Sequence, residues 1–409
     1  MTANRYSQPF IRKVTIRNYK SIAACQVELQ NLMFLVGRNG AGKSNFLDAL
    51  RFVADALRTS LDHALRDRGT IKEVRRRSGG HPNHFAIRLD FSLLDGSDGH
   101  YSFRVGAKPG GGYEVQSEEC MLRVNVIPAK THTYHVKSGR VLTSSIEPLP
   151  AVLPDRLSLV AASGLPEFRP VFDALSRIEI YNLNPKVMAM PQLPDPGELL
   201  RRDGSNAASM LQQIDEGSRD QISRYLSQIV PGVSTAEPRT LGAQETIEFR
   251  QSVKGQGHPW RFLASSMSDG TLRAFGILLA IFQSGVMQNS QQPLVIGLEE
   301  PEMALHPAAA STLLAALREA SHTVQILVTS HSPDLLDNPD IPVESLLAVE
   351  NEDSLTRIGP IDPAGRIVLR EKRFTPGELL RQNQLAPDPT AITDVQSERQ
   401  LNLFDLNGR

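Results

Sequence analysis

The sequence is poor in cysteine, in net charge and in long apolar runs. Its two cysteines, Cys25 and Cys120, stand far apart, which excludes a cysteine metal spacing and predicts two reduced, buried thiols. The formal net charge is −1 over 409 residues, so nucleic-acid binding would require a local basic patch. No run of about 18 apolar residues and no signal-peptide pattern is present. We therefore expect a soluble, cytoplasmic protein without membrane contact.

What the sequence does contain is an alternation of apolar runs and helical patterns near both ends. Residues 12–36 read as two strands, and residues 37–60 as a glycine-rich loop followed by a helix. Residues 260–350 read as helices that alternate with the apolar strand runs 294–298 and 324–328. Such alternation is typical of a sheet covered by helices. We predict an α/β fold in which residues 12–60 and 260–350 build one core sheet.

Between these segments lie two regions of different character. Residues 85–126 alternate apolar and polar side chains around a glycine turn, which predicts an antiparallel β lobe. Residues 150–255 predict a helical and irregular insertion without a long coiled coil. Apolar density falls after Phe374, so residues 375–409 are expected to form a flexible tail behind a single unit of residues 1–374.

Residues 37–44, Gly-Arg-Asn-Gly-Ala-Gly-Lys-Ser, fit the phosphate-loop pattern G-x-x-x-x-G-K-[ST] at every position. The pattern follows a predicted strand and opens a predicted helix, whose N-terminal N–H groups and dipole favour an anion. Lys43 is expected to reach the β- and γ-phosphates, and the Ser44 hydroxyl to ligate Mg²⁺. The sequence therefore predicts a nucleoside triphosphate site.

Two carboxylates, Glu299 and Glu300, close the apolar run 294–298. Because parallel strands end at the ligand face of such a sheet, Glu299 is predicted to support Mg²⁺ and Glu300 to orient and polarise the attacking water. The alternative is a pair of solvated acids at a strand end. His331 also follows an apolar strand run and is predicted to contact the γ-phosphate or the attacking water, with a structural histidine as the alternative.

The turn Ser268-Asp269-Gly270 opens another predicted helix. One reading is an ordinary N-cap, in which the Ser268 hydroxyl accepts a hydrogen bond from the first turn. The other is a second anion site at a helix N-terminus. Because the chain has one strong phosphate loop, this second site requires a γ-phosphate from elsewhere.

The order of these motifs carries a resemblance: phosphate loop, Ser-Asp-Gly-Thr turn, Glu-Glu-Pro-Glu run and Ser-His-Ser run. The chain resembles the ABC-type ATPases of the RecF/SMC group. More narrowly, it is similar to compact bacterial AAA-type ATPases related to the OLD and RecF families, many of them found in DNA-repair and phage-defence modules. Residues 16–21 and 300–307 are also similar to that family. The resemblance implies an ABC-type P-loop NTPase head with a mixed sheet, an antiparallel β lobe and a helical insertion lobe.

In that family two heads sandwich two ATP molecules, and each signature turn completes the partner's site. The resemblance therefore implies ATP and Mg²⁺ as cofactors and an ATP-dependent homodimer. Residues 302–306 correspond to the D-loop, and His331 to the switch histidine. The nucleotide contacts implied are those of Gly37, Asn39, Gly40, Gly42, Lys43, Ser44, Asn45 and Lys20, with Ser268, Asp269 and Gly270 acting in trans.

This sequence departs from the family pattern at three places, the first of which is the lack of a long coiled coil in residues 150–255. The usual Walker B aspartate is Glu299 here, and its longer side chain can still ligate Mg²⁺. The Q-loop glutamine of the family has no assigned position in this chain.

Two further segments suggest partners. The basic stretch 66–77 fits either contact with a DNA backbone or a solvated surface with local ion pairs. Residues 400–404, Gln-Leu-Asn-Leu-Phe, resemble the peptide with which bacterial replication and repair proteins dock on the DNA sliding clamp. In that reading Leu401, Leu403 and Phe404 fill an apolar groove while Gln400 hydrogen-bonds a sub-pocket. The alternatives are packing back on the body or docking on another protein.

Three functions fit these observations. The first is an ATPase whose ATP-driven homodimerisation is coupled to a DNA transaction or to genome defence. The second is a switch or scaffold ATPase that holds or releases a separately encoded effector, such as a nuclease, since no nuclease motif follows the ATPase motifs. The third, a transporter's nucleotide-binding subunit, disagrees with the Glu-Glu-Pro-Glu and Leu-His-Pro runs and with the RecF-like start.

Overall fold

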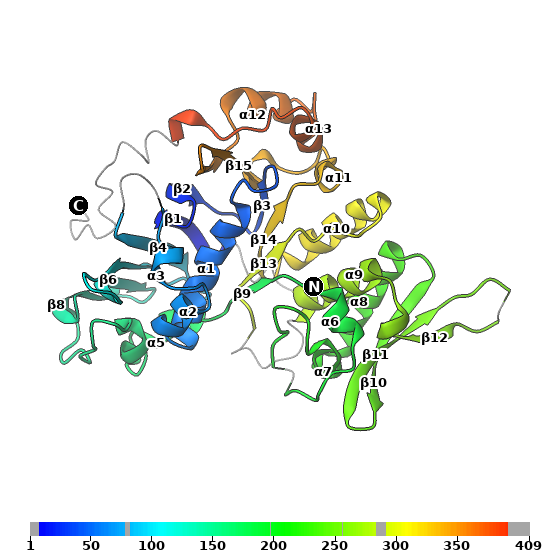
Figure 1. Ribbon diagram of the computed structural model, residues 1–409, viewed down its shortest axis with the longest axis horizontal. Helices are drawn as coiled ribbons and strands as arrows, with labels where there is room; N and C mark the ends of the chain where they lie inside the picture. The colour runs from blue at the N-terminus through cyan, green and yellow to red at the C-terminus, as the bar shows by residue number, and fades with distance from the viewer. Residues whose placement is uncertain (1–7, 78–81, 197, 256, 284–291, 392–409) are drawn as a thin grey trace.

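The computed structural model describes residues 8–77, 82–196, 198–255, 257–283 and 292–391. At its centre lies a mixed sheet, in which 13 strands pair within these residues (Figure 1). In sheet order the strands are β8 Arg140–Ser144, β7 Lys130–Lys137, β6 Tyr113–Val124, β5 Asp98–Ala107, β4 His84–Ser92, β1 Ile11–Tyr19, β2 Ile22–Glu28, β16 Leu355–Pro360, β15 Leu346–Glu352, β3 Leu32–Val36, β14 Gln325–Ser330, β13 Val295–Glu299 and β9 Ile178–Tyr181.

The parallel part of the sheet joins both ends of the sequence. Strand β3 runs between β14 and β15, and β13 lies beyond β14. A continuous apolar run suits β3 because both faces of the sheet are covered. Met33 and Leu35 pack into one hydrophobic core, and Phe34 and Val36 into the other. Strands from residues 12–60 and from residues 260–350 thus pair in one sheet, which strands from other segments extend.

The antiparallel part of the sheet runs from β2 through β1 and β4 to β8. Residues 12–36 form three strands where the sequence predicted two, because the chain reverses between β1 and β2 at Lys20, whose φ is 48°. Beyond the predicted β lobe of residues 85–126, β7 and β8 continue the antiparallel pairing to Ser144.

Helices cover both faces of this sheet (Figure 1). On the face that holds the phosphate-loop helix lie α1 Lys43–Arg58, α2 Leu61–Arg66, α3 Ile71–Val74, α4 Ser158–Ala162 and α5 Arg169–Leu175. The other core is formed with α6 Pro185–Ala189, α7 Ala207–Gln213, α8 Glu216–Ile229, α9 Asp269–Phe282, α10 Ala310–Ala320 and α11 Pro333–Leu336. A separate sheet of β10 Val233–Leu241, β11 Gln244–Gln251 and β12 Trp260–Leu263 packs beside α7 and α8.

The chain after Phe374 begins with order that the sequence did not predict. Following α12 Pro363–Arg370, a capping box at Thr375 starts α13 Pro376–Arg381, where a flexible tail was expected. Leu379 of α13 is buried, and Arg381 pairs with Asp337. A few apolar side chains and the ion pairs of Arg381 with Asp334 and Asp337 thus hold this segment beside α11.

One buried carboxylate, Glu118 of β6, ties the antiparallel strands to α4. Its oxygens accept hydrogen bonds from the hydroxyls of Tyr101 (3.0 Å) and Tyr134 (2.9 Å) and from the amides of Ser158 and Leu159. Burial raises the pKa of the Glu118 carboxyl, while these four donors stabilise its charged form.

We expect Glu118→Gln to lower the free energy of unfolding by about 2–3 kcal/mol, because an amide NH₂ would face a backbone donor and leave it unsatisfied. Urea unfolding followed by circular dichroism measures the change. The exposed Glu28→Gln on β2 is the control and should stay within about 0.5 kcal/mol of the parent. Equal stability of Glu118→Gln and the parent would show that the four hydrogen bonds add little.

Candidate nucleotide site

The phosphate loop, residues 37–42, leaves β3 and enters α1 at Lys43. Gly40 and Gly42 have φ values of 77° and 103°, a backbone conformation that residues with a side chain rarely adopt. These two positions let the chain curl so that the first turn of α1 faces the loop. The local geometry is that of an anion cradle at a helix N-terminus.

The side chain of Lys43 fills this cradle. Its ammonium nitrogen donates to the carbonyl oxygens of Gly37 (2.8 Å) and Arg38 (3.0 Å), and the residue is 5% exposed. Burial lowers the pKa of Lys43, and the nearby carboxylates Glu300 and Glu302 oppose that shift. The cation predicted to bind phosphate therefore lies inside the loop, among the carboxylates of the site.

Ser44 and Glu299, the two predicted Mg²⁺ ligands, are in direct contact. The Ser44 hydroxyl donates a hydrogen bond to the Glu299 carboxylate at the end of β13. Burial raises the pKa of Glu299, and this hydrogen bond opposes the shift. In the part of the chain that the structure describes, no group of three or more His, Cys, Asp or Glu side chains could hold a metal alone. A hydroxyl and one carboxylate suit Mg²⁺, which takes its other ligands from nucleotide phosphates and water.

Glu300 and His331 come together from the ends of neighbouring parallel strands. Glu300 follows β13 with φ 45°, and its amide donates to the carbonyl of Thr329 on β14 (3.0 Å). Its carboxylate oxygen Oε1 lies 2.9 Å from Nδ1 of His331. Because both side chains are about 30% exposed, a water molecule can reach them.

Glu302 holds the backbone that carries His331. Its carboxylate accepts hydrogen bonds from the Ser330 hydroxyl and the Ser332 amide. Burial raises the pKa of Glu302, and these donors oppose the shift. Glu302 thus orients the loop of residues 330–332, and His331 of that loop contacts Glu300.

The predicted signature turn lies at the start of α9. The Ser268 hydroxyl accepts from the amide of Thr271 (3.2 Å), which is the N-cap geometry. A Cβ on Gly270 would lie 2.4 Å from the carbonyl oxygen of Ala304, so a larger residue would displace the loop after Glu302. Among the described residues, no hydrogen bond or ion pair joins residues 268–270 to the phosphate loop of the same chain.

Arg273, one turn into α9, connects this helix to the carboxylates. Its guanidinium donates to the carbonyl oxygens of Glu299 and Glu300, both at 3.0 Å, and to that of Leu183 at 3.2 Å. Arg273 of α9 therefore holds the backbone that positions the Glu299 and Glu300 side chains.

Comparison with known families and structures fits this geometry. Residues 130–337, half of the chain, match the family described as "AAA domain, putative AbiEii toxin, Type IV TA system". The chain belongs to this AAA domain family. Residues 10–95, which hold the phosphate loop, match a second family, described as "AAA ATPase domain". No curated protein matches the AAA-domain chain.

Two solved SMC heads share the fold. One, an SMC head bound to the C-terminal winged-helix domain of ScpA, is 14% identical with a TM-score of 0.53, over 86% of this chain and 97% of that one. Another, a Pyrococcus furiosus SMC head with an extended coiled coil bound to the C-terminal domain of ScpA, is 12% identical with a TM-score of 0.52, over 90% and 100%. The AAA-domain chain thus has the fold of an ABC/SMC-like ATPase head. No helix among its described residues is long and apolar enough to cross a bilayer.

Three other predicted nucleotide residues, Lys20, Asn45 and Asn39, lie in or beside the loop. Lys20 forms an ion pair with Asp48 of α1, with 2.6 Å between Nζ and Oδ2. Asn45 donates from Nδ2 to the hydroxyl of Ser21 (2.7 Å). Lys20 would have to leave Asp48 to contact a phosphate, whereas Asn45 already supports the turn between β1 and β2.

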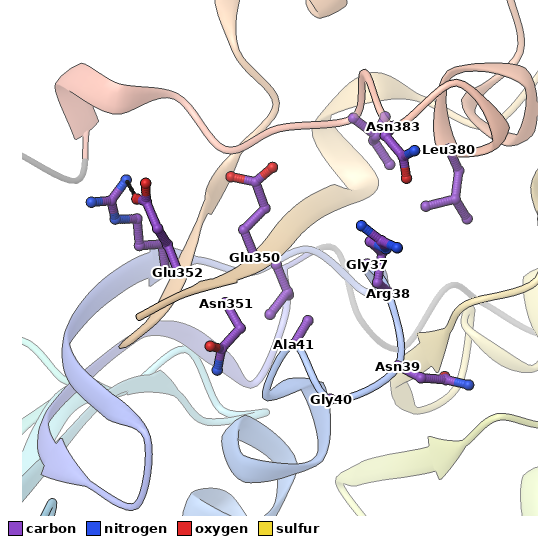
Figure 2. A pocket seen from close by; sticks show the side chains of 13 residues that line it. Gly37, Arg38, Asn39, Gly40, Ala41, Glu350, Asn351, Glu352, Leu380 and Asn383 are labelled. Atoms are coloured by element: carbon purple, nitrogen blue, oxygen red, sulfur yellow. Dashed lines mark ion pairs between the residues drawn. The ribbon is translucent and has the colours of Figure 1, made fainter. Parts of the chain in front are cut away.

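Asn39 lines a cavity of about 700 Å³ on the outer side of the loop (Figure 2). Its other walls come from β15, β16 and the segment after α13, and include Glu350 and Asn383. Neither Lys43 nor Glu300 lines this cavity. The cavity therefore does not include the Glu300–His331 pair, which follows strands β13 and β14 rather than β15 and β16.

The basic stretch 66–77 has partners within the chain. Arg68, 5% exposed at its side chain, bridges Asp48 and Asp55 of α1. Arg66 pairs with Asp62 and Arg77 with Glu73, while Arg75 donates to the carbonyl oxygen of Pro82. Local ion pairs, one of the two readings left open by the sequence, are thus present in this stretch, and contact with a DNA backbone stays a prediction. The clamp-like residues Gln400, Leu401, Leu403 and Phe404 lie outside the described residues.

Sequence reasoning did not identify the contacts of Arg273, of Ser21 or of Thr356, whose hydroxyl donates to the carbonyl oxygen of Ala41 in the phosphate loop. Arg273 had a weak signal, since it lies four residues after Asp269 and so shares its face once a helix is assumed. Thr356 had none, because only the pairing of β16 with β2 brings it to the phosphate loop.

Proposed function

We propose that this AAA-domain chain binds ATP with Mg²⁺ and hydrolyses it, and that ATP closes a homodimer. The observation that carries the proposal is the meeting of Lys43, the Ser44–Glu299 contact and the Glu300–His331 pair at the carboxyl ends of three neighbouring parallel strands. Ligands of open α/β sheets bind at this edge.

Binding would begin at Lys43. Its ammonium moves from the carbonyls of Gly37 and Arg38 to the β- and γ-phosphates, which offer more charge, while the loop amides donate to the same oxygens. Ser44 and Glu299 would hold Mg²⁺. When bound, the ion neutralises charge that develops on the phosphate oxygens.

Hydrolysis would use Glu300 and His331. Glu300 accepts a hydrogen bond from the attacking water and polarises it toward the γ-phosphorus. His331, 2.9 Å from the Glu300 carboxylate, holds that carboxylate in place and donates from its ring toward the phosphate side. Glu302 fixes the loop through Ser330 and keeps His331 aligned.

Dimerisation supplies what one chain lacks. Ser268, Asp269 and Gly270 form a helix N-terminus without a bond to their own phosphate loop, so we assign them to the γ-phosphate of a second copy. Arg273 of the same helix holds the backbone of Glu299 and Glu300. Docking of this helix on a partner's nucleotide would therefore affect the position of both carboxylates.

The use of this cycle is proposed to be a DNA transaction or genome defence. The alternative is a switch that holds or releases a separate effector, and it is favoured by one observation: both similar SMC heads were solved with a domain of a partner protein bound. Steady-state ATP hydrolysis by the purified chain, with and without linear duplex DNA, separates the two, with Glu300→Gln as the blank. Stimulation by DNA supports the first reading. Turnover indifferent to DNA supports the second.

Arg273→Ala tests the link between α9 and the carboxylates. Loss of three hydrogen bonds to backbone carbonyls should let Glu299 and Glu300 shift, and we expect kcat to fall about 10- to 100-fold. Affinity for ATP without Mg²⁺, measured by calorimetry, should change little because Lys43 is untouched. Arg261→Ala on the exposed part of β12 is the matched control and should keep parental kcat. Parental turnover in Arg273→Ala would remove Arg273 from the proposed mechanism.

A further inference from the structure

Thr356 of β16 reaches the phosphate loop from the C-terminal part of the chain. Its side chain is 1% exposed, and its hydroxyl donates to the carbonyl oxygen of Ala41 within the loop (2.9 Å). The hydroxyl oxygen of Thr356 also lies 2.6 Å from the hydroxyl oxygen of Ser21. A residue far along the sequence thus bonds the loop backbone directly.

These contacts form a chain of hydrogen bonds with one direction. Thr356 has a single hydroxyl hydrogen, which it gives to Ala41, so Ser21 must donate to Thr356. Asn45 in turn donates to Ser21 (2.7 Å). The chain therefore runs from the first turn of α1 through Ser21 and Thr356 back to the loop, and each hydroxyl both accepts and donates.

The packing at the same place is close. A Cβ on Gly42 would lie 2.1 Å from Oγ1 and 2.7 Å from Cγ2 of Thr356, so the end of the loop rests on this side chain. At the other end of the loop, a Cβ on Gly37 would lie 2.0 Å from the carbonyl oxygen of Val349 on β15. The hairpin of β15 and β16 therefore touches the loop at both ends.

The backbone of Thr356 is itself held in place. Its amide donates to the carbonyl of Ser21 (3.0 Å), and the strand pairs there with Ile22 of β2. Just before it, Asp353 and Ser354 have positive φ values of 52° and 62° in the tight turn between β15 and β16. The backbone of Thr356 is thus held on both sides, so its side chain can support the phosphate loop at a defined place.

We propose that Thr356 is a positioning residue for nucleotide binding: it holds the phosphate loop in the conformation that receives ATP, with Ser21 as its relay to α1. The inference rests on the proposed function. Without this support, ATP binding would have to order the loop, and that ordering would weaken affinity. Glu300 and His331 lie on β13 and β14, on the other side of β3, so turnover of bound ATP should depend little on Thr356.

Thr356→Val tests the proposal because valine keeps the shape and removes the hydroxyl, which leaves the Ala41 carbonyl and the Ser21 hydroxyl without this partner. We expect the Kd for ATP, measured by calorimetry, and the KM to rise about 10-fold, with kcat within about 2-fold of the parent. Thr356→Ser restores the hydroxyl and should recover most of the affinity. The control is Thr246→Val, a buried threonine of β11, which should bind ATP like the parent.

The outcomes separate the inference from the function on which it rests. If the parent binds ATP and Thr356→Val binds it with equal affinity, the inference is overturned and the proposed function is not. A lower Tm with unchanged Kd and KM also overturns it, because Thr356 would then be structural only. Failure of the parent to bind ATP overturns the proposed function and the inference with it. If Thr356→Val does not fold, Ser21→Ala cuts the same hydrogen-bond chain from a partly exposed turn, and its Kd decides by the same criterion.

Discussion

Glu300→Gln should bind ATP, fail to hydrolyse it and accumulate as a dimer. Glutamine keeps the length and shape of the side chain but cannot accept the proton of the attacking water, and removal of a general base costs about 10²- to 10⁴-fold in rate. His331 would then face an amide in place of the carboxylate. Steady-state ATP hydrolysis measures the loss, and light scattering with and without ATP measures the mass.

Two neighbouring carboxylates provide the comparison. Glu299→Gln removes the carboxylate that Ser44 contacts, so we expect it to weaken Mg²⁺-dependent ATP binding, which Glu300→Gln should not do. Glu302→Gln keeps an acceptor for Ser330 and should lose less activity than Glu300→Gln. If Glu300→Gln hydrolyses ATP at the parental rate, the base is another residue. If it binds ATP and stays monomeric, the proposed coupling of nucleotide to dimerisation is wrong.

The core of the fold and the placement of the central candidate residues were readable because each depends on short stretches of sequence. A continuous apolar run such as 32–36 can only be buried on both faces, and a glycine-rich loop after it leaves few functions besides phosphate binding. Glu300 and His331 each follow such a run, and strands that point the same way bring their ends together. The structure places these two side chains 2.9 Å apart, as that reasoning requires.

What the sequence did not show depends on register and on competition between partners. Thr356 reaches Ala41 because β16 pairs with β2 at Ile22, and no local pattern predicts that pairing. Arg68 lies in a basic stretch that suited DNA, yet Asp48 and Asp55 of α1 bind it, and the spacing along the chain hides these partners. Helix α13 was missed because a single buried leucine and side-chain contacts to α11 replace the usual apolar periodicity.

Lys43→Ala should abolish ATP binding, with an affinity loss of at least about 100-fold. Lys43 is the cation inside the phosphate loop, and Glu299, Glu300 and Glu302 surround the same space with negative charge. Without the ammonium, an ATP anion would meet these carboxylates with only backbone N–H groups and Mg²⁺ to offset them. Calorimetric titration with ATP, in the presence of Mg²⁺, measures the loss.

Lys20→Ala is the informative control, because Lys20 was also predicted to contact the nucleotide but is held by Asp48. We expect it to reduce affinity only a few-fold, since a partly exposed ion pair contributes little and Asp48 already holds the Lys20 ammonium. The two variants together test the loop more sharply than either alone. Equal losses would mean that Lys20 leaves Asp48 when ATP binds and acts as a second phosphate ligand. Tight binding by Lys43→Ala, with a parental Tm, would place the nucleotide elsewhere and remove the basis for assigning residues 37–44 as its cradle.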